Sequence, residues 1–107
     1  MTGCVVRKWE ARVARADLEG WVATYRERVL DNVKQVDGFQ SVAFHANRDG
    51  DPCDVTVLMK WDDMDAIKRF AVEDPAKAVI PDFMQPFLVD ADARATFHDE
   101  ILLEART

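Results

Sequence analysis

The order in which hydrophobic patterns follow one another is the feature that most constrains how this chain can fold. Residues 4–14 alternate apolar and polar side chains, as a strand does when one of its faces is wetter than the other. Residues 16–38 carry apolar side chains at intervals of three and four, which predicts one long amphipathic helix. Asp17 is a suitable N-cap for that helix, and Gly38 is a suitable residue to end it.

The rest of the chain shows the same two kinds of pattern. Residues 39–61 predict a hairpin, in which two alternating strands flank an Asp-Gly-Asp-Pro turn. Asp62 stands where an N-cap belongs, and the apolar stripe that follows predicts a second helix ending at Pro75. We expect short helical turns over 76–90, and residues 93–105 alternate again as a last strand.

The resulting order, β-α-β-β-α-β, predicts a ferredoxin-like fold of the α+β class. It uses nearly the whole chain, so residues 1–107 are expected to form a single domain. Right-handed crossovers then give an antiparallel sheet of order 4-1-3-2, counting the predicted strands along the chain. Both helices cover one face of this sheet. We expect a second copy of the chain to cover the other face, which gives a homodimer.

Charge and composition exclude several classes of partner and site. Acidic residues outnumber basic ones by 20 to 14, for a net charge of −6, and no Lys/Arg stripe offsets this, so nucleic acid is not an expected partner. No apolar run exceeds three residues, and the N-terminal residues lack the apolar core of a signal peptide. We therefore expect no membrane span and a cytoplasmic location. His, Cys, Asp and Glu do not have the spacing of a metal site, so no metal is expected.

Four stretches carry a resemblance to a known superfamily. They are Trp61 at the end of the third strand, the helix DDMDAIKRFA, the segment AKAVIP and the strand FHDEIL. Together they resemble the antibiotic-biosynthesis-monooxygenase-like (ABM-like) group of the dimeric α+β barrel superfamily. In the last strand His98, Glu100 and Ile101 match the group's His-aromatic-Glu-aliphatic pattern, whereas Asp99 stands where an aromatic is usual. The resemblance implies a dimeric α+β barrel, but the superfamily includes monooxygenases, haem-degrading enzymes and isomerases, so the fold alone does not select an activity.

Haem degradation is the activity in this superfamily that the sequence argues against. Its enzymes use an Asn on the first strand, a Trp on the second helix and a later His as the iron ligand. The corresponding positions here fall on Trp9, Phe70 and near Ile80. Because an Ile side chain cannot ligate iron, the resemblance implies no haem, and we expect no other cofactor.

A cofactor-independent monooxygenase makes fewer demands on the chain. A phenolic or anthrone-type substrate loses a proton in a dry pocket, and the electron-rich carbanion then reacts with oxygen directly. Arg7 would stabilise the anion and His98 would take the proton near neutral pH, so these two are the predicted catalytic residues. The predicted substrate-binding residues are Trp9, Tyr25, Trp61, Phe70, Phe83 and Glu100.

Other roles for the same residues stay open at this stage. Trp9 and Trp61 also fit a hydrophobic core, and Arg7 could pair with Glu100 across adjacent strands, with His98 held in the same network. Two other functions are also open. One is a homodimer that binds a small aromatic or hydrophobic molecule without catalysis. The other is an interaction dimer whose cavity is filled by its own side chains.

Overall fold

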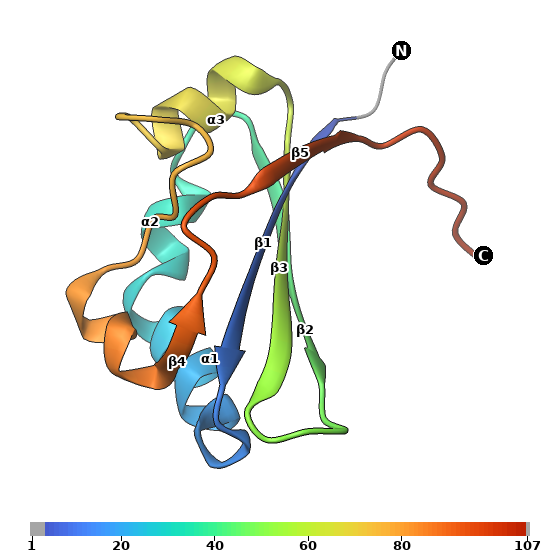
Figure 1. Ribbon diagram of the computed structural model, residues 1–107. Helices are drawn as coiled ribbons and strands as arrows, with labels where there is room; N and C mark the ends of the chain where they lie inside the picture. Colours follow the sequence, from blue (N-terminus) through green and yellow to red (C-terminus); the bar gives the residue numbers. More distant parts are fainter. Residues whose placement is uncertain (1–3, 107) are drawn as a thin grey trace.

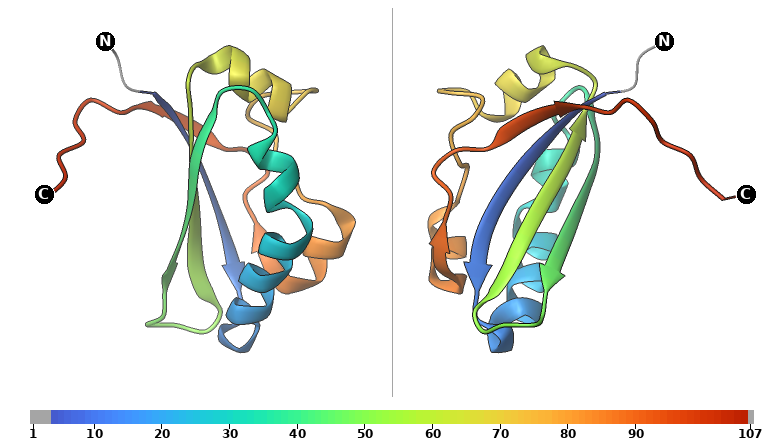
Figure 2. Two further views of the ribbon diagram at one scale, coloured as in Figure 1. Left: turned by 180° about the vertical axis from the view of Figure 1, so that it is seen from behind. Right: turned by 45° about the vertical axis from the view of Figure 1, so that its right-hand side comes forward.

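A computed structural model describes residues 4–106 as a single sheet with its helices packed on one side (Figure 1). The opposite face of the sheet carries no helix in any of the views (Figure 2). The strands are β1 (Val5–Val13), β2 (Phe39–Asn47), β3 (Cys53–Trp61), β4 (Leu88–Ala91) and β5 (Thr96–Asp99). The helices are α1 (Leu18–Arg28), α2 (Leu30–Lys34) and α3 (Met64–Phe70), with the 3-10 turns η1 (Arg15–Asp17) and η2 (Asp82–Phe87).

The sheet is antiparallel, and β1 is its most connected strand. The strand order is β2-β3-β1-β4, and β5 also pairs with β1. This confirms the predicted order, with the place of the fourth strand shared by two short ones. Since β1 and β2 both run antiparallel to β3, helices α1 and α2 connect two parallel strands, as in the ferredoxin-like fold.

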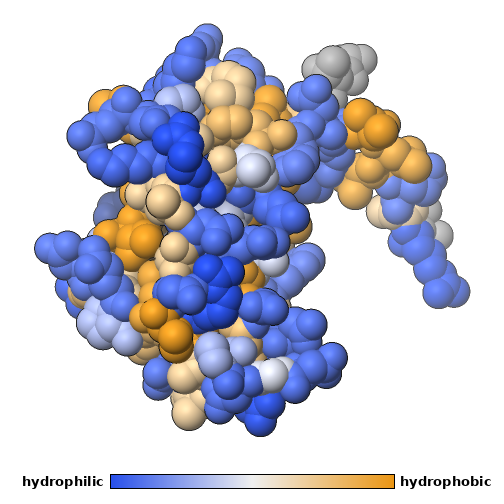
Figure 3. Space-filling model, in the orientation of Figure 1, coloured by the Kyte–Doolittle hydropathy of each residue, from blue (hydrophilic) through white to orange (hydrophobic). Residues whose placement is uncertain are grey.

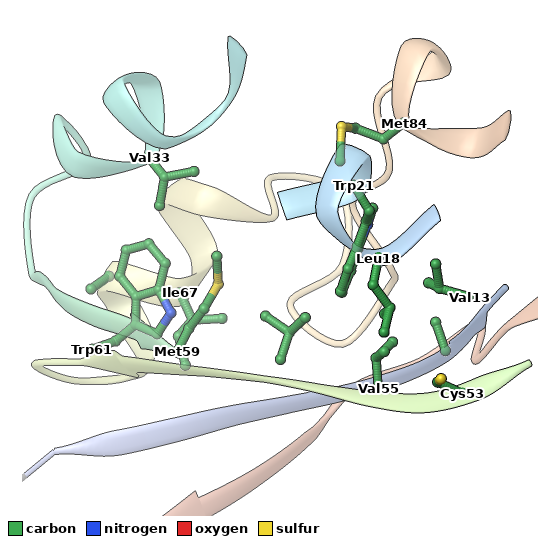
Figure 4. Packing of buried hydrophobic residues seen from close by; sticks show 13 residues of the cluster. Val13, Leu18, Trp21, Val33, Cys53, Val55, Met59, Trp61, Ile67 and Met84 are labelled. Carbon is green, nitrogen blue, oxygen red and sulfur yellow. The ribbon is translucent and has the colours of Figure 1, made fainter. Parts of the chain in front are cut away.

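Pairing register decides which side chains of the sheet face the helices. β1 and β3 pair without a slip from Val5 opposite Trp61 to Val13 opposite Cys53. Because side chains alternate along a strand, the odd-numbered residues of both strands share the face that the helices cover. The residues buried there and on the helices form the hydrophobic core (Figure 4), which includes Val13, Leu18, Trp21, Val33, Val55, Met59, Trp61, Ile67 and Met84.

The helix predicted for 16–38 is present but divided. α1 and α2 meet at Val29, where φ is −120°, although its N–H still donates to the carbonyl of Tyr25 at 2.9 Å. Asp17 stands at the predicted N-cap, but its side chain makes no capping hydrogen bond. Gly38 lies beyond the end of α2 with a positive φ, as expected of a residue that ends a helix.

The cap of α3 is one residue later than predicted. The carboxylate of Asp63 accepts from the N–H of Ala66 at 2.9 Å, which is the N-cap hydrogen bond. Asp62 instead accepts from the side-chain amide of Gln40 at 2.8 Å. Asp62 therefore fixes the end of β3 against β2 rather than starting the helix.

The C-terminal third differs most from the sequence prediction. Residues 82–87 form a helical turn as expected, but 88–91 form β4 where the sequence predicts further turns. Of the strand predicted over 93–105, only 96–99 pair, as β5. β4 and β5 occupy successive parts of the same edge of β1, so each is short. A four-residue strand carries too little alternation to be recognised from sequence.

No helix that the structure describes is both long and apolar enough to cross a membrane. The cytoplasmic location stays a prediction.

Gly38 provides a test of how tightly α3 packs against the rest of the fold. Its φ is +92°, and a Cβ added there would lie 2.4 Å from the Cβ of Ala66. We predict that Gly38→Ala lowers the free energy of unfolding by about 2 kcal/mol or more, because the new side chain meets both backbone strain and a steric clash. Urea denaturation measures this.

The matched control is Gly50→Ala. Its added Cβ would have no neighbour nearer than 3.7 Å, and its φ is not positive. We expect this control to change the free energy of unfolding by less than about 1 kcal/mol. Equal losses in the two variants would contradict the packing described here.

Candidate functional site

A cavity of about 80 Å³ lies between the covered face of the sheet and the helices. Its floor consists of odd-numbered residues of the two central strands, Arg7 and Trp9 of β1 and Val57 and Met59 of β3. The walls are Trp21, Tyr25 and Val29 from α1 and its end, Phe44 of β2, Phe70 of α3, and Val79, Ile80, Pro81, Met84 and Leu88 of the segment leading into β4. The strand register and the helix stripe therefore bring these side chains together.

Arg7 is the one charged residue of this lining. Only 4 % of it is exposed, and its guanidinium donates from Nε to the carbonyl of Pro75 at 3.0 Å and from Nη2 to that of Lys77 at 2.7 Å. Its Cζ also lies 5.3 Å from the centre of the Phe70 ring. No carboxylate in the described chain forms an ion pair with it. Burial lowers the pKa of Arg7 and the charge of Asp74 opposes this, but a guanidinium stays protonated, so the cavity holds a positive charge.

Tyr25 is the second polar group of the lining. Its hydroxyl is buried and has no hydrogen-bond partner within the described residues. Burial raises the pKa of Tyr25 to about 12, so the phenol is neutral and can donate a hydrogen bond. An unpaired buried hydroxyl costs about 1–3 kcal/mol, and a ligand with an acceptor oxygen would recover that cost.

Aromatic rings form much of the wall around these two groups. Phe44 stacks on Trp21 with 4.6 Å between ring centres and lies 4.7 Å from the centre of Tyr25. Trp9 is held in place because its indole Nε1–H donates to the carbonyl of Asp92 at 2.7 Å. Since that hydrogen bond satisfies the indole, Trp9 offers a ligand only its apolar faces.

Four of the predicted site residues meet at this cavity: Arg7, Trp9, Tyr25 and Phe70. Trp61 is fully buried in the core, and its ring centre lies 5.2 Å from that of Phe70. It supports a cavity wall without lining the cavity.

Phe83 does not line the cavity either. It lies in η2 with the guanidinium of Arg28 3.8 Å from its ring centre. This cation–π contact ties η2 to the end of α1.

His98 and Glu100 lie on the opposite face of the sheet. In the pairing of β5 with β1, His98 lies opposite Val6. The even-numbered side chains of β5 are therefore on the same face of the sheet as Val6, and not on that of Arg7. His98 is exposed and its Nε2 lies 2.8 Å from the hydroxyl of Thr96. Within a single copy of the chain, neither His98 nor Glu100 lines the cavity. The catalytic role of His98 and the substrate-binding role of Glu100 stay predictions.

The sequence-based pairing of Arg7 with Glu100 is wrong. Glu100 forms its ion pair with Lys60 at 2.7 Å and accepts from the thiol of Cys4 at 3.7 Å, while Arg7 bonds to backbone carbonyls. Glu100 directly follows β5, and its N–H bonds to the carbonyl of Cys4, which continues the register of β5 on β1 and puts Glu100 on the face opposite Arg7.

Sequence reasoning missed several lining residues. Trp21 lies one helical turn before Tyr25, so the two share one face of α1. Phe44 is two residues after Val42 in β2, so these two share one face of that strand. Both spacings could have indicated the covered faces. Ile80 and Met84 lie within a segment that contains Pro75, Pro81 and Pro86 and has no regular hydrophobic period, and only the folded path of that segment brings them to the cavity.

Comparisons with known proteins support the fold. The chain matches no protein-family model and no curated protein. Among solved structures it resembles a monooxygenase from the ActVA-Orf6 gene of Streptomyces coelicolor, solved in complex with the ligand nanaomycin D, with a TM-score of 0.72 and 18 % identity over 98 % of this chain and 94 % of that one. It also resembles a Bacillus cereus protein that has been proposed to be an antibiotic biosynthesis monooxygenase, with a TM-score of 0.67 and 12 % identity over 98 % of both chains. At these identities the likeness shows a shared fold.

The lining offers apolar surface for a ring and a positive charge for a negatively charged oxygen. In apolar surroundings the field of a guanidinium is stronger than in water. No carboxylate or imidazole is found among the described lining residues, and the described chain has no cluster of three or more metal-ligand side chains. The guanidinium of Arg7 and the hydroxyl of Tyr25 are therefore polar groups of the described lining that a ligand could contact.

The burial of Tyr25 can be tested directly, because the chain has a single tyrosine. We predict that tyrosinate absorbance at 295 nm rises with a midpoint near pH 12 in the folded protein and near 10 in urea. The unfolded chain ionises first, so the free energy of unfolding falls as pH rises from about 10 to 12.

Tyr25→Phe should remove that part of the pH dependence. Circular dichroism at each pH shows that the protein is still folded. A midpoint near 10 in protein that is still folded would contradict the burial of the phenol.

Proposed function

We propose that the protein belongs to the ABM-like family and is a cofactor-independent monooxygenase for a small phenolic or anthrone-type molecule. The observation that carries the proposal is the guanidinium of Arg7, buried in an aromatic cavity without an ion-pair partner in the described chain. The shared fold with two proteins described as monooxygenases supports the same assignment.

The proposed reaction starts from the oxyanion of the substrate. Loss of a proton gives a phenolate or enolate whose charge is shared with a ring carbon, and Arg7 with the hydroxyl of Tyr25 stabilises the oxygen. The ring carbon adds O₂ and a proton to form a hydroperoxide. Loss of water then converts that carbon to a carbonyl, so one O₂ oxidises one substrate to a quinone and water.

In the proposed reaction, no side chain of the described cavity lining acts as the base that removes the substrate proton. The described lining has no carboxylate or imidazole, so stabilisation of the anion by Arg7 must lower the pKa of the substrate itself. Val79 is 47 % exposed and borders the cavity, which gives the proton a short path to solvent.

The size of the cavity limits how a substrate enters. About 80 Å³ is less than the roughly 150 Å³ of an engineered cavity that binds benzene. A substrate with one or more rings must therefore displace wall residues. A substrate oxyanion would replace the hydrogen bonds of Arg7 to the carbonyls of Pro75 and Lys77, which hold the segment that continues into the cavity wall at Val79, Ile80 and Pro81.

We further infer that the working form is a homodimer. The uncovered face of the sheet mixes the half-buried apolar residues Val6 and Leu58 with the charged residues Lys8, Glu10 and Lys60. A second copy offers the same face and is the simplest partner for it. Such pairing would add to the apolar surface that a chain of 107 residues buries.

Arg7→Met tests the proposed function. We predict that it lowers kcat/KM by about 100-fold or more for 1-naphthol or anthrone, because the oxyanion loses its charged partner. Oxygen uptake and quinone absorbance measure the rate against the spontaneous oxidation.

Two further variants complete this test. Arg7→Lys keeps the charge and should retain part of the activity. Arg69→Met is the matched control, since Arg69 also donates to a backbone carbonyl, that of Asp37, but on an exposed surface. A folded Arg7→Met protein with wild-type turnover would refute the role of Arg7.

A binding protein without catalysis is the second candidate. The absence of a base from the described cavity lining favours it, because the cavity could hold a neutral phenol without ionising it. Saturable binding of 1-naphthol and of anthrone without oxygen uptake would favour a binding protein over a monooxygenase.

Tyr25→Phe tests ligand recognition under either function. We predict that it weakens 1-naphthol binding by roughly 3- to 10-fold, the worth of one neutral hydrogen bond. Naphthalene has no oxygen and should bind both forms equally. Quenching of tryptophan fluorescence measures both affinities, because Trp9 and Trp21 line the cavity. An equal effect on the two ligands would mean that Tyr25 contributes packing only.

A further inference from the structure

The buried guanidinium of Arg7 is oriented by one short segment that follows α3. Its Nε donates to the carbonyl of Pro75 and its Nη2 to that of Lys77, at 3.0 and 2.7 Å. A guanidinium is planar and its N–H donors have fixed directions, so two fixed acceptors also set the directions of its other donors. The way in which Arg7 faces the cavity therefore depends on what holds residues 74–78 in place.

Asp74 starts this segment and takes part in the hydrogen bonds that fix it. Its Oδ1 accepts from the N–H of Ala76 at 3.0 Å, and its backbone carbonyl accepts from the N–H of Lys77 at 3.1 Å. Its two carboxylate oxygens also accept from Nη1 and Nη2 of Arg94, at 2.9 and 3.4 Å. The carboxylate thus joins the turn at Pro75 to the chain between β4 and β5.

The backbone of the segment is bonded on both of its sides. The carbonyls of Pro75 and Lys77 accept from Arg7, whereas the carbonyl between them, that of Ala76, accepts from the N–H of Ala95 at 2.6 Å. Ala76 and Ala95 are both buried. The segment therefore lies between the side chain of Arg7 and the stretch that carries the partner of Asp74.

The ion pair of Asp74 lies on the outside of the molecule. Figure 3 shows mainly hydrophilic residues over the segment between α3 and η2. Asp74 and Arg94 pair there with 38 % and 64 % of their side chains exposed. Since a pair this exposed contributes little to the free energy of unfolding, we expect the protein to fold without it.

Asp74 also acts on Arg7 without pairing with it. Among the described residues the two form no ion pair, yet the negative charge of Asp74 opposes the lowering of the pKa of Arg7 by burial. The pKa of Asp74 is itself lowered, first by the hydrogen bonds from Arg94 and then by that from Ala76. The carboxylate is therefore ionised at neutral pH and favours the protonated guanidinium.

We propose that Asp74 is a positioning residue for Arg7. It holds residues 75–77 so that their carbonyls orient the guanidinium toward the cavity before a ligand arrives. A substrate oxyanion that takes over donors of Arg7 then meets a charge that is already in place. The orientation of Arg7 stands on the contacts alone, and its consequence for catalysis rests on the function proposed above.

The first test follows Arg7 itself and needs no substrate. Hydrogen exchange of its Nε–H is measured by ¹H–¹⁵N NMR, and the signal is identified by its absence from Arg7→Lys. We expect this exchange to be at least about tenfold faster in Asp74→Ala, because the acceptor carbonyl of Pro75 is no longer held. Unchanged exchange in a folded Asp74→Ala protein would overturn the proposal.

Glu73→Ala is the matched control for this test. Glu73 is the neighbouring carboxylate, and its Oε2 lies 3.4 Å from Nζ of Lys77, so the variant loses the same charge without losing a bond of the turn. We expect the exchange of the Arg7 signal to stay within about twofold of wild type. Equally fast exchange in Glu73→Ala and Asp74→Ala would refute a specific role of Asp74.

Further variants separate the bonds of Asp74 from its charge. Asp74→Asn keeps an acceptor oxygen for the N–H of Ala76 and should restore most of the slow exchange. Arg94→Ala removes the partner of the carboxylate and should speed the exchange less than Asp74→Ala does. The double variant Asp74→Ala/Arg94→Ala should match Asp74→Ala alone, since both changes act through one contact. Additive effects would contradict that shared contact.

The second test measures oxygen uptake with 1-naphthol or anthrone. We expect kcat/KM to fall about tenfold in Asp74→Ala, to recover in Asp74→Asn and to stay unchanged in Glu73→Ala. The affinity for naphthalene should be the same in all of these proteins, because naphthalene has no oxygen for Arg7 to contact. A weaker affinity for naphthalene in Asp74→Ala would point to a damaged cavity wall and would contradict positioning through Arg7.

The two tests keep the two proposals apart. A wild-type protein without oxygen uptake would refute the monooxygenase function, and the exchange of the Arg7 signal would still decide the role of Asp74. Normal turnover in Asp74→Ala together with fast exchange would overturn the part of Asp74 in catalysis and support its part in orienting Arg7.

Discussion

Strand β1 is the constraint on which the rest of the structure depends. It pairs with β3 along its whole length on one side and with β4 and β5 in succession on the other. Because its side chains alternate, this one register sends Arg7 and Trp9 to the helices and Val6 to the uncovered face. The cavity, the core and the surface proposed for the partner copy all follow from that division.

The buried charge of Arg7 shows how the fold accommodates a polar group in an apolar cavity. A carboxylate partner would neutralise the guanidinium and leave little field for a ligand. The carbonyls of Pro75 and Lys77 instead satisfy two of its donors without adding a negative charge. The positive charge therefore has no carboxylate partner among the described residues, and the same two bonds join β1 to the segment that continues into the cavity wall at Val79, Ile80 and Pro81.

The two edges of the sheet are paired differently. At one edge, β4 and β5 share β1, so each of them is short, and the aliphatic residues after β5, Ile101, Leu102 and Leu103, are exposed. At the other edge, β2 pairs only with β3 among the described strands. An edge strand without a partner and exposed aliphatic residues each favour association between chains.

The sequence by itself determined the element order, the strand order and the faces of the long elements, because alternation and helical spacing are local properties. It placed Arg7 and Trp9 on the apolar face of the first strand, Tyr25 in the apolar stripe of the first helix, and Gly38 just past the end of that helix. Tertiary structure alone decided the position of β4, the face of His98 and Glu100, and the contribution of Ile80 and Met84 to the cavity. These depend on which strands become neighbours and in what register, and a shift of one residue in β5 would have sent Glu100 to the face of Arg7. Such pairings join residues about ninety positions apart, and no local pattern specifies them.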